Sequence, residues 1–205
     1  MRIPLLGASL ALLACAAAAD PMHIPLGQKD VTLATAGTYT LDPNHVSVEA
    51  RVSHIGFSTS IFRFGKAEAT LHWDPKAIAK SKLDATVEVN SLMTNVAGFA
   101  EELQGDKYLN AAKNPRASFV STAFRQTDAT HGKVDGRLTL MGKTLPVTFE
   151  VTLVGAGPGF AGGPVMGHVI GIHAETAVDP HTLGLPAILS APIAIVIDTE
   201  FDNKG

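Results

Sequence analysis

Residues 133–153 read KVDGRLTLMGKTLPVTFEVTL, and this stretch decides the fold class. In its second half every other residue is apolar: Val147, Phe149, Val151 and Leu153. A period of two is typical of a β-strand that buries one face. Gly142 separates this run from the one before it, and glycine readily takes the positive φ that a tight hairpin needs. The stretch therefore predicts two antiparallel strands joined by a short turn.

The same alternation recurs along most of the chain. Strand-like runs cover residues 46–52, 66–73, 83–89, 116–124, 133–140, 168–178 and 192–201. Strands outnumber helices, and no strand–helix–strand repeat is present, so the pattern favours an all-β antiparallel meander. We expect this meander to curl into a barrel, because closure removes exposed sheet edges.

One segment has a helical period instead. Val96, Phe99, Ala100 and Leu103 are spaced i, i+3, i+4 and i+7, which predicts one short amphipathic helix over residues 96–103. Asn95 is a suitable residue to cap the start of this helix.

Charge and composition exclude one broad class of partner. The chain has 205 residues with 16 basic and 19 acidic side chains, which gives a net charge of -3. Nucleic-acid binding usually needs a clustered basic face, so no nucleic-acid partner is expected.

The first residues are typical of an export signal. Arg2 is followed by an apolar run that ends in small residues, which predicts a signal peptide over 1–19 with cleavage after Ala19. A membrane anchor and a lipoprotein modified at Cys15 are the alternatives. After the signal we expect a lead-in segment over 20–37 and one barrel domain over 38–205, located in the periplasm. Cys15 is the single cysteine, so no disulfide is expected.

Three motifs carry a family resemblance. They are YTLDPNHVSV at residues 39–48, HIGFST at 54–59 and GRLTLMGKTLPV at 136–147. In this order they resemble the YceI-like family of bacterial periplasmic proteins. The resemblance implies an eight-stranded antiparallel lipocalin-like barrel around an apolar tunnel that binds a long-chain amphiphile, a polyisoprenoid or an isoprenoid quinone. Where the family has an arginine-containing motif, residues 178–184 read VDPHTLG, so a head-group contact through that arginine is absent.

The resemblance and the aromatic pattern together give a set of candidate ligand-binding residues. This set is Phe57, Phe62, Phe64, Leu92, Met93, Phe99, Leu103, Phe119, His45 and His54. Each apolar member is equally interpretable as ordinary core, since the interior of a small barrel is also its core. The two histidines either bind loops at a barrel end or line the ligand mouth. A homodimer and a transient membrane contact are further possible partners.

Catalytic and metal-binding patterns are not found in the sequence. There is no His-Glu-x-x-His motif, and His168 and His173 lie five residues apart, on opposite faces of a strand. The Gly-rich run at 155–159 starts no helix that could hold a phosphate. We therefore expect no enzyme activity, no metal and no cofactor.

Two hypotheses follow from these observations. The first is a carrier of a long amphiphile; the second is a non-enzymatic, stress-related interaction module whose barrel is filled by side chains. The presence or absence of an apolar cavity discriminates between them.

Overall fold

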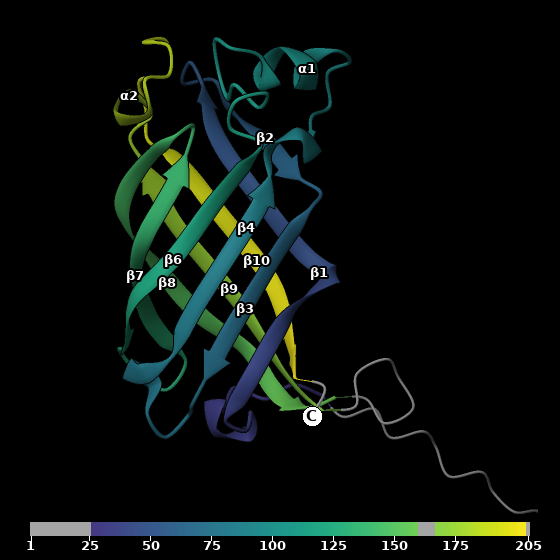
Figure 1. Cartoon of the computed structure of the whole chain (residues 1–205), viewed down its shortest axis with the longest axis vertical. Helices are drawn as coiled ribbons and strands as arrows, with labels where there is room; N and C mark the ends of the chain where they lie inside the picture. Colours follow the sequence, from purple (N-terminus) through teal and green to yellow (C-terminus); the bar gives the residue numbers. More distant parts are fainter. Residues whose placement is uncertain (1–25, 160–166, 204–205) are drawn as a thin grey trace, which may run out of the picture.

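The computed structural model describes residues 26–159 and 167–203. Within these ranges the chain forms ten strands and two short α-helices (Figure 1). The strands are β1 (Gly37–His54), β2 (Ser58–Phe64), β3 (Ala67–Trp73), β4 (Lys82–Glu88), β5 (Leu92–Met93), β6 (Arg116–Gln126), β7 (His131–Leu140), β8 (Lys143–Pro158), β9 (His168–Val178) and β10 (Ile193–Asn203). The helices are α1 (Phe99–Gln104) and α2 (Pro180–Leu183), with single 3-10 turns at η1 (Val31–Leu33), η2 (Ile78–Lys80) and η3 (Val89–Ser91).

Eight of the strands close into an antiparallel barrel. Their order is β1, β3, β4, β6, β7, β8, β9 and β10, and β10 pairs back onto β1. The remaining two, β2 and β5, extend the sheet beside the upper half of β1. Here "upper" means the end that carries α1 and α2 in Figure 1. The all-β barrel is therefore confirmed.

The hairpin between β7 and β8 forms as its sequence predicts. Leu140 pairs with Lys143, which leaves a two-residue turn. Met141 and Gly142 both have positive φ, at 54° and 73°. This is the combination that a type I′ turn requires, and its twist matches that of the two strands.

The helix predicted over 96–103 is present but begins later. It covers Phe99–Gln104, and Gly98, not Asn95, occupies the N-cap position. A second helix, α2, was not predicted from the sequence. It has only four residues, but Asp179 caps its first turn and Pro180 begins it.

Strand β1 is long and changes neighbours halfway. Its lower part, Gly37–Thr40, pairs with β3, and its upper part, from Val48 onward, pairs with β2. Between them the register with β10 shifts, so that residues 42–45 lie opposite Glu200. This wide bulge leaves a seam between β1 and β3 where the two strands are not paired.

Two apolar clusters fill the barrel ends. The upper one includes Phe119, Phe149 and Leu183 of α2, and the lower one includes Tyr39, Leu71 and Phe201. The lower end is covered by the segment before β1: Tyr39 donates a hydrogen bond to the Thr35 carbonyl at 2.8 Å. None of the helices in residues 26–159 and 167–203 is long and apolar enough to cross a membrane.

Candidate functional site

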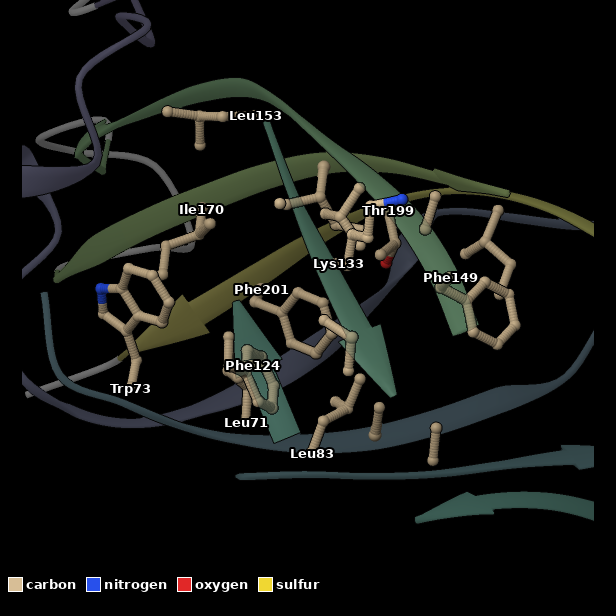
Figure 2. Close-up of a pocket in the computed structure, with 18 of the residues that line it drawn as sticks. Leu71, Trp73, Leu83, Phe124, Lys133, Phe149, Leu153, Ile170, Thr199 and Phe201 are labelled. Atoms are coloured by element: carbon tan, nitrogen blue, oxygen red, sulfur yellow. The ribbon is translucent and has the colours of Figure 1, made fainter. Parts of the chain in front are cut away.

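A cavity of about 200 Å³ lies inside the barrel. Its wall takes residues from both apolar clusters, because the inward positions of successive strands alternate with outward polar ones. Figure 2 shows these side chains around one space, with Trp73 at one end and Phe149 at the other. The main apolar residues of the wall are Leu71, Trp73, Leu83, Phe124, Phe149, Leu153, Ile170 and Phe201.

Two basic residues of this wall form ion pairs with neighbouring strands. Lys133 pairs through its Nζ with Glu150 at 2.6 Å, and Arg125 pairs with Asp135. Thr199 is buried in the wall, and its hydroxyl donates to the Glu200 carbonyl at 3.3 Å. The wall also contains Glu68 and Asp128, so its Lys and Arg side chains equal its Asp and Glu side chains in number, and it offers a ligand mainly apolar contact.

A second hollow, of about 680 Å³, lies at the seam between β1 and β3. Its rim carries the charged side chains Lys66, Glu68, Asp84, Glu88 and Arg116. The hollow and the inner cavity share wall residues: Leu41, Ala67, Glu68, Ala69, Ala85, Thr86 and Phe119. Three of these are alanines, whose small side chains leave the wall thin. The two spaces therefore adjoin, and they differ in lining: the inner one is almost wholly apolar, whereas the other is mixed.

The bulge in β1 is held by a hydrogen-bonded group on the outer wall. Nδ1 of His45 lies 2.6 Å from Oδ2 of Asp42 and 3.8 Å from Oε2 of Glu200. Burial acts to raise the pKa of Asp42, but hydrogen bonds from His45 and Asn44 outweigh it, so this pKa is lowered. The bond to Asp42 and the charge of Glu200 raise the pKa of His45.

This group also has a spacing that a metal ion could use. Asp42, His45 and Glu200 each offer a ligand atom within 4.8 Å of the others, and no other such trio occurs among the described residues. The Nδ1 of His45 is already bonded to Asp42, however. The geometry therefore fits a brace for the bulge, and we assign no metal to it.

A second histidine group lies at the β6–β7 turn and superficially resembles a catalytic triad. Nδ1 of His131 lies 2.9 Å from the Asp128 carboxylate and 3.1 Å from the Thr130 hydroxyl. Backbone bonds from Thr130 and the bond to His131 lower the pKa of Asp128 to about 2. In a triad the imidazole takes the hydroxyl proton on one ring nitrogen while the carboxylate holds the other. Here the hydroxyl and the carboxylate both contact Nδ1, so the group lacks that arrangement.

The structure separates the residues proposed from the sequence. Phe119 lines both hollows. Leu92 is buried, and the rings of Phe62 and Phe99 meet at 6.1 Å beside α1. Four further members, Phe64, Leu103, His45 and His54, are half-buried or exposed and line neither hollow. Phe57 and Met93 are exposed to solvent, at 86% and 48%.

The main wall residues were not in the proposed set. The alternation of apolar and polar residues along each strand could have identified them. Phe149 and Leu153 belong to the apolar face of one such run, and Leu71 and Trp73 alternate with His72. The motif-based choice instead favoured residues around the turn after β1, where parity does not decide which way a side chain points.

The fold and cavity define a closed antiparallel barrel with an apolar interior. A model of the YceI-like domain matches residues 39–201, so the chain belongs to the YceI-like family. The UPF0312 protein VPA0850 of Vibrio parahaemolyticus is 36% identical over 152 residues, which cover 72% of this chain and 76% of that protein.

Solved structures agree with this barrel. BcnA of Burkholderia cenocepacia superposes with a TM-score of 0.68 at 20% identity, covering 80% of this chain and 99% of BcnA. A polyisoprenoid binding domain from Saccharophagus degradans superposes with a TM-score of 0.56 at 12% identity, covering 80% of this chain and 97% of that domain. At these identities the likeness concerns the fold.

Proposed function

We propose that this protein binds a long-chain amphiphile, a polyisoprenoid or an isoprenoid quinone, and carries it in the periplasm with the tail inside the barrel. The proposal rests on the apolar cavity inside the barrel. The polyisoprenoid binding domain with the same fold supports the ligand class. A cavity also supports a carrier over an interaction module whose interior is filled by side chains.

In this proposal the ligand occupies both spaces. The inner cavity, at about 200 Å³, is only somewhat larger than the ~150 Å³ cavity that takes a benzene molecule. A long tail therefore also needs the adjoining hollow of about 680 Å³ at the seam. The polar rim of that hollow suits the head group. Its side chains include both signs of charge, which favours a neutral or zwitterionic head.

Binding energy in this arrangement comes mainly from the tail. Each buried CH₂ contributes about 0.8 kcal/mol, whereas a neutral hydrogen bond contributes about 1 kcal/mol net. Residues 178–184 form the end of β9 and α2, where Leu183 packs into the upper cluster and Asp179 caps the helix, and no arginine is present there. The head group therefore adds little to affinity.

A matched pair of alanine substitutions tests the location of the ligand. Ala85 lies in the wall shared by both spaces, whereas Ala177 is exposed on β9. We expect Ala85→Phe to weaken binding of a long-chain prenyl ligand at least tenfold, because the ring occupies the space of the tail. Ala177→Phe leaves affinity unchanged. Displacement of an apolar dye measures both, and Ala69→Leu is a milder filling variant if Ala85→Phe unfolds. Undiminished affinity in a folded filled variant contradicts the proposal.

Export is part of the proposal and concerns residues 1–19, which lie outside the described residues. We expect the mature chain to begin at Asp20. The intact mass of protein from the periplasmic fraction measures this. A mass that starts at Met1, or one that carries a diacylglyceryl group on Cys15, contradicts it.

A further inference from the structure

Exposed apolar side chains gather at the upper end of the barrel. Nine large apolar residues are exposed among the described residues, and five lie on the β1–β2 turn, on β2 and in the β5–α1 segment. We name these five the apolar tip: Ile55 (60% exposed), Phe57 (86%), Ile61 (50%), Met93 (48%) and Val96 (61%). Figure 1 places the end of β1 and α1 at the same end of the barrel.

The backbone of the tip is unusual for its residue types. Ile55 has a φ of 45°, in the left-handed region that β-branched residues rarely adopt. Gly56 follows with a φ of 81° and has open space around it. Asn or Gly would form this turn with less strain. An exposed isoleucine at a strained position indicates that its side chain has a use outside the barrel.

The shape of the tip favours a soft apolar partner. Two of its residues, Ile55 and Phe57, lie on a turn at the end of a hairpin. No tip residue lines either of the two hollows, so the tip is separate from the proposed ligand site. A projecting apolar turn suits insertion into the boundary between the head groups and acyl chains of a bilayer.

Arginines flank the tip on the same face of the sheet. Arg51 pairs in register with Ile61, and Arg63 with Met93. Both arginines share one acidic partner, Glu49, so this trio carries a net positive charge. Guanidinium groups bind phosphate oxygens well, and their stems can lie along apolar surface. The exposed Glu101 and Glu102 of α1 offset this charge, so insertion of apolar side chains outweighs electrostatic attraction.

We propose that the apolar tip inserts into a phospholipid bilayer and docks the upper end of the barrel on the membrane surface. The purpose of such docking rests on the proposed function, because a carrier of long amphiphiles must collect or deliver them at a bilayer. The docking itself depends only on the tip.

Vesicle flotation tests this surface. Vesicles of phosphatidylethanolamine and phosphatidylglycerol are mixed with the full mature chain and with the double variant Ile55→Asn, Phe57→Ser. Asn tolerates the left-handed conformation, so the fold is retained. The matched control is Val154→Ser, a 57% exposed apolar residue on β8. We expect the tip variant to bind vesicles at least tenfold more weakly, the control to bind like the unaltered chain, and binding to vary little with salt.

A direct readout of insertion comes from fluorescence. In a Trp73→Phe background, Phe57→Trp is expected to give a blue-shifted emission on addition of vesicles. The proposal is overturned if the unaltered chain does not bind vesicles or if the tip variant binds equally well. It is also overturned if the tip variant turns a dimer into a monomer without changing vesicle binding, since the tip then serves a second copy of the chain. Binding of a long-chain prenyl ligand by the unaltered chain is measured in parallel by displacement of an apolar dye. If the unaltered chain binds vesicles but not this ligand, the carrier function is refuted and the docking stands.

Discussion

The barrel interior and the apolar tip use the same residue types for opposite purposes. Phe119 and Phe57 both lie near family motifs, but Phe119 is 7% exposed and Phe57 is 86% exposed. Phe119 stands on a strand whose inward face is enclosed by barrel closure. Phe57 stands on a turn, where no neighbouring strand covers it. Burial in this fold therefore follows from position on a closed strand and not from residue type.

The two regions also differ in backbone conformation. The interior is built on continuous antiparallel ladders, in which β7 and β8 pair over ten residues of β7. The tip combines a left-handed isoleucine with a left-handed glycine. The interior therefore rests on regular strand pairing, whereas the tip retains strain and exposed apolar area.

The largest expected effect comes from truncating one phenylalanine in each region. Phe149 is 6% exposed and its ring meets Phe119 edge to face at 5.2 Å. We expect Phe149→Ala to lower the free energy of unfolding by about 3–5 kcal/mol, because it removes buried area and leaves a cavity. Phe57→Ala should change it by less than about 0.5 kcal/mol. Urea unfolding measures both, and equal losses would erase the distinction between the regions.

A smaller effect concerns the bulge that opens the seam. The raised pKa of His45 means that its contribution to stability is full below its ordinary value of 6.5 and is lost as the pH rises through the folded value. The lowered pKa of Asp42 means that its contribution is present above 3.8 and is lost as the pH falls. Stability from this pair is thus greatest between pH 3.8 and 6.5.

The test compares urea midpoints at pH 6 and pH 8.5. His45 is 62% exposed, so solvent screens the pair and its contribution is below about 1 kcal/mol. We expect the unaltered chain to lose this small stability between the two pH values, and His45→Gln to lose less. An identical pH dependence in both proteins would show that the brace does not hold the bulge.

The sequence predicted the fold better than the site. Alternation over residues 133–153 and its repeats is a local signal, and it led to the correct barrel and to the β7–β8 hairpin. The α2 helix was not predicted, because four residues are too few to show a helical period. The seam was not predicted either. The bulge opposite Glu200 depends on pairing with β10, which lies about 150 residues away in the chain.

The wall of the cavity shows the same limit. Strand parity could have identified Phe149 and Leu153, but it could not tell which inward residues leave space between them. That space depends on three alanines from two strands, Ala67, Ala69 and Ala85, meeting at one side of the barrel. Side-chain volume across paired strands is a tertiary property that one strand does not reveal.

The central claim is that an apolar tail, enclosed in the barrel, drives binding. Its most direct test is a titration with prenyl compounds of increasing length and constant head group, read by the fluorescence of Trp73, the single tryptophan, which lies in the cavity wall. We predict that affinity rises with each added isoprene unit until the cavity and the seam hollow are full and then levels off, and that a change of head group alters it little. Equal affinity for short and long tails, or loss of binding on a change of head group alone, would contradict the account.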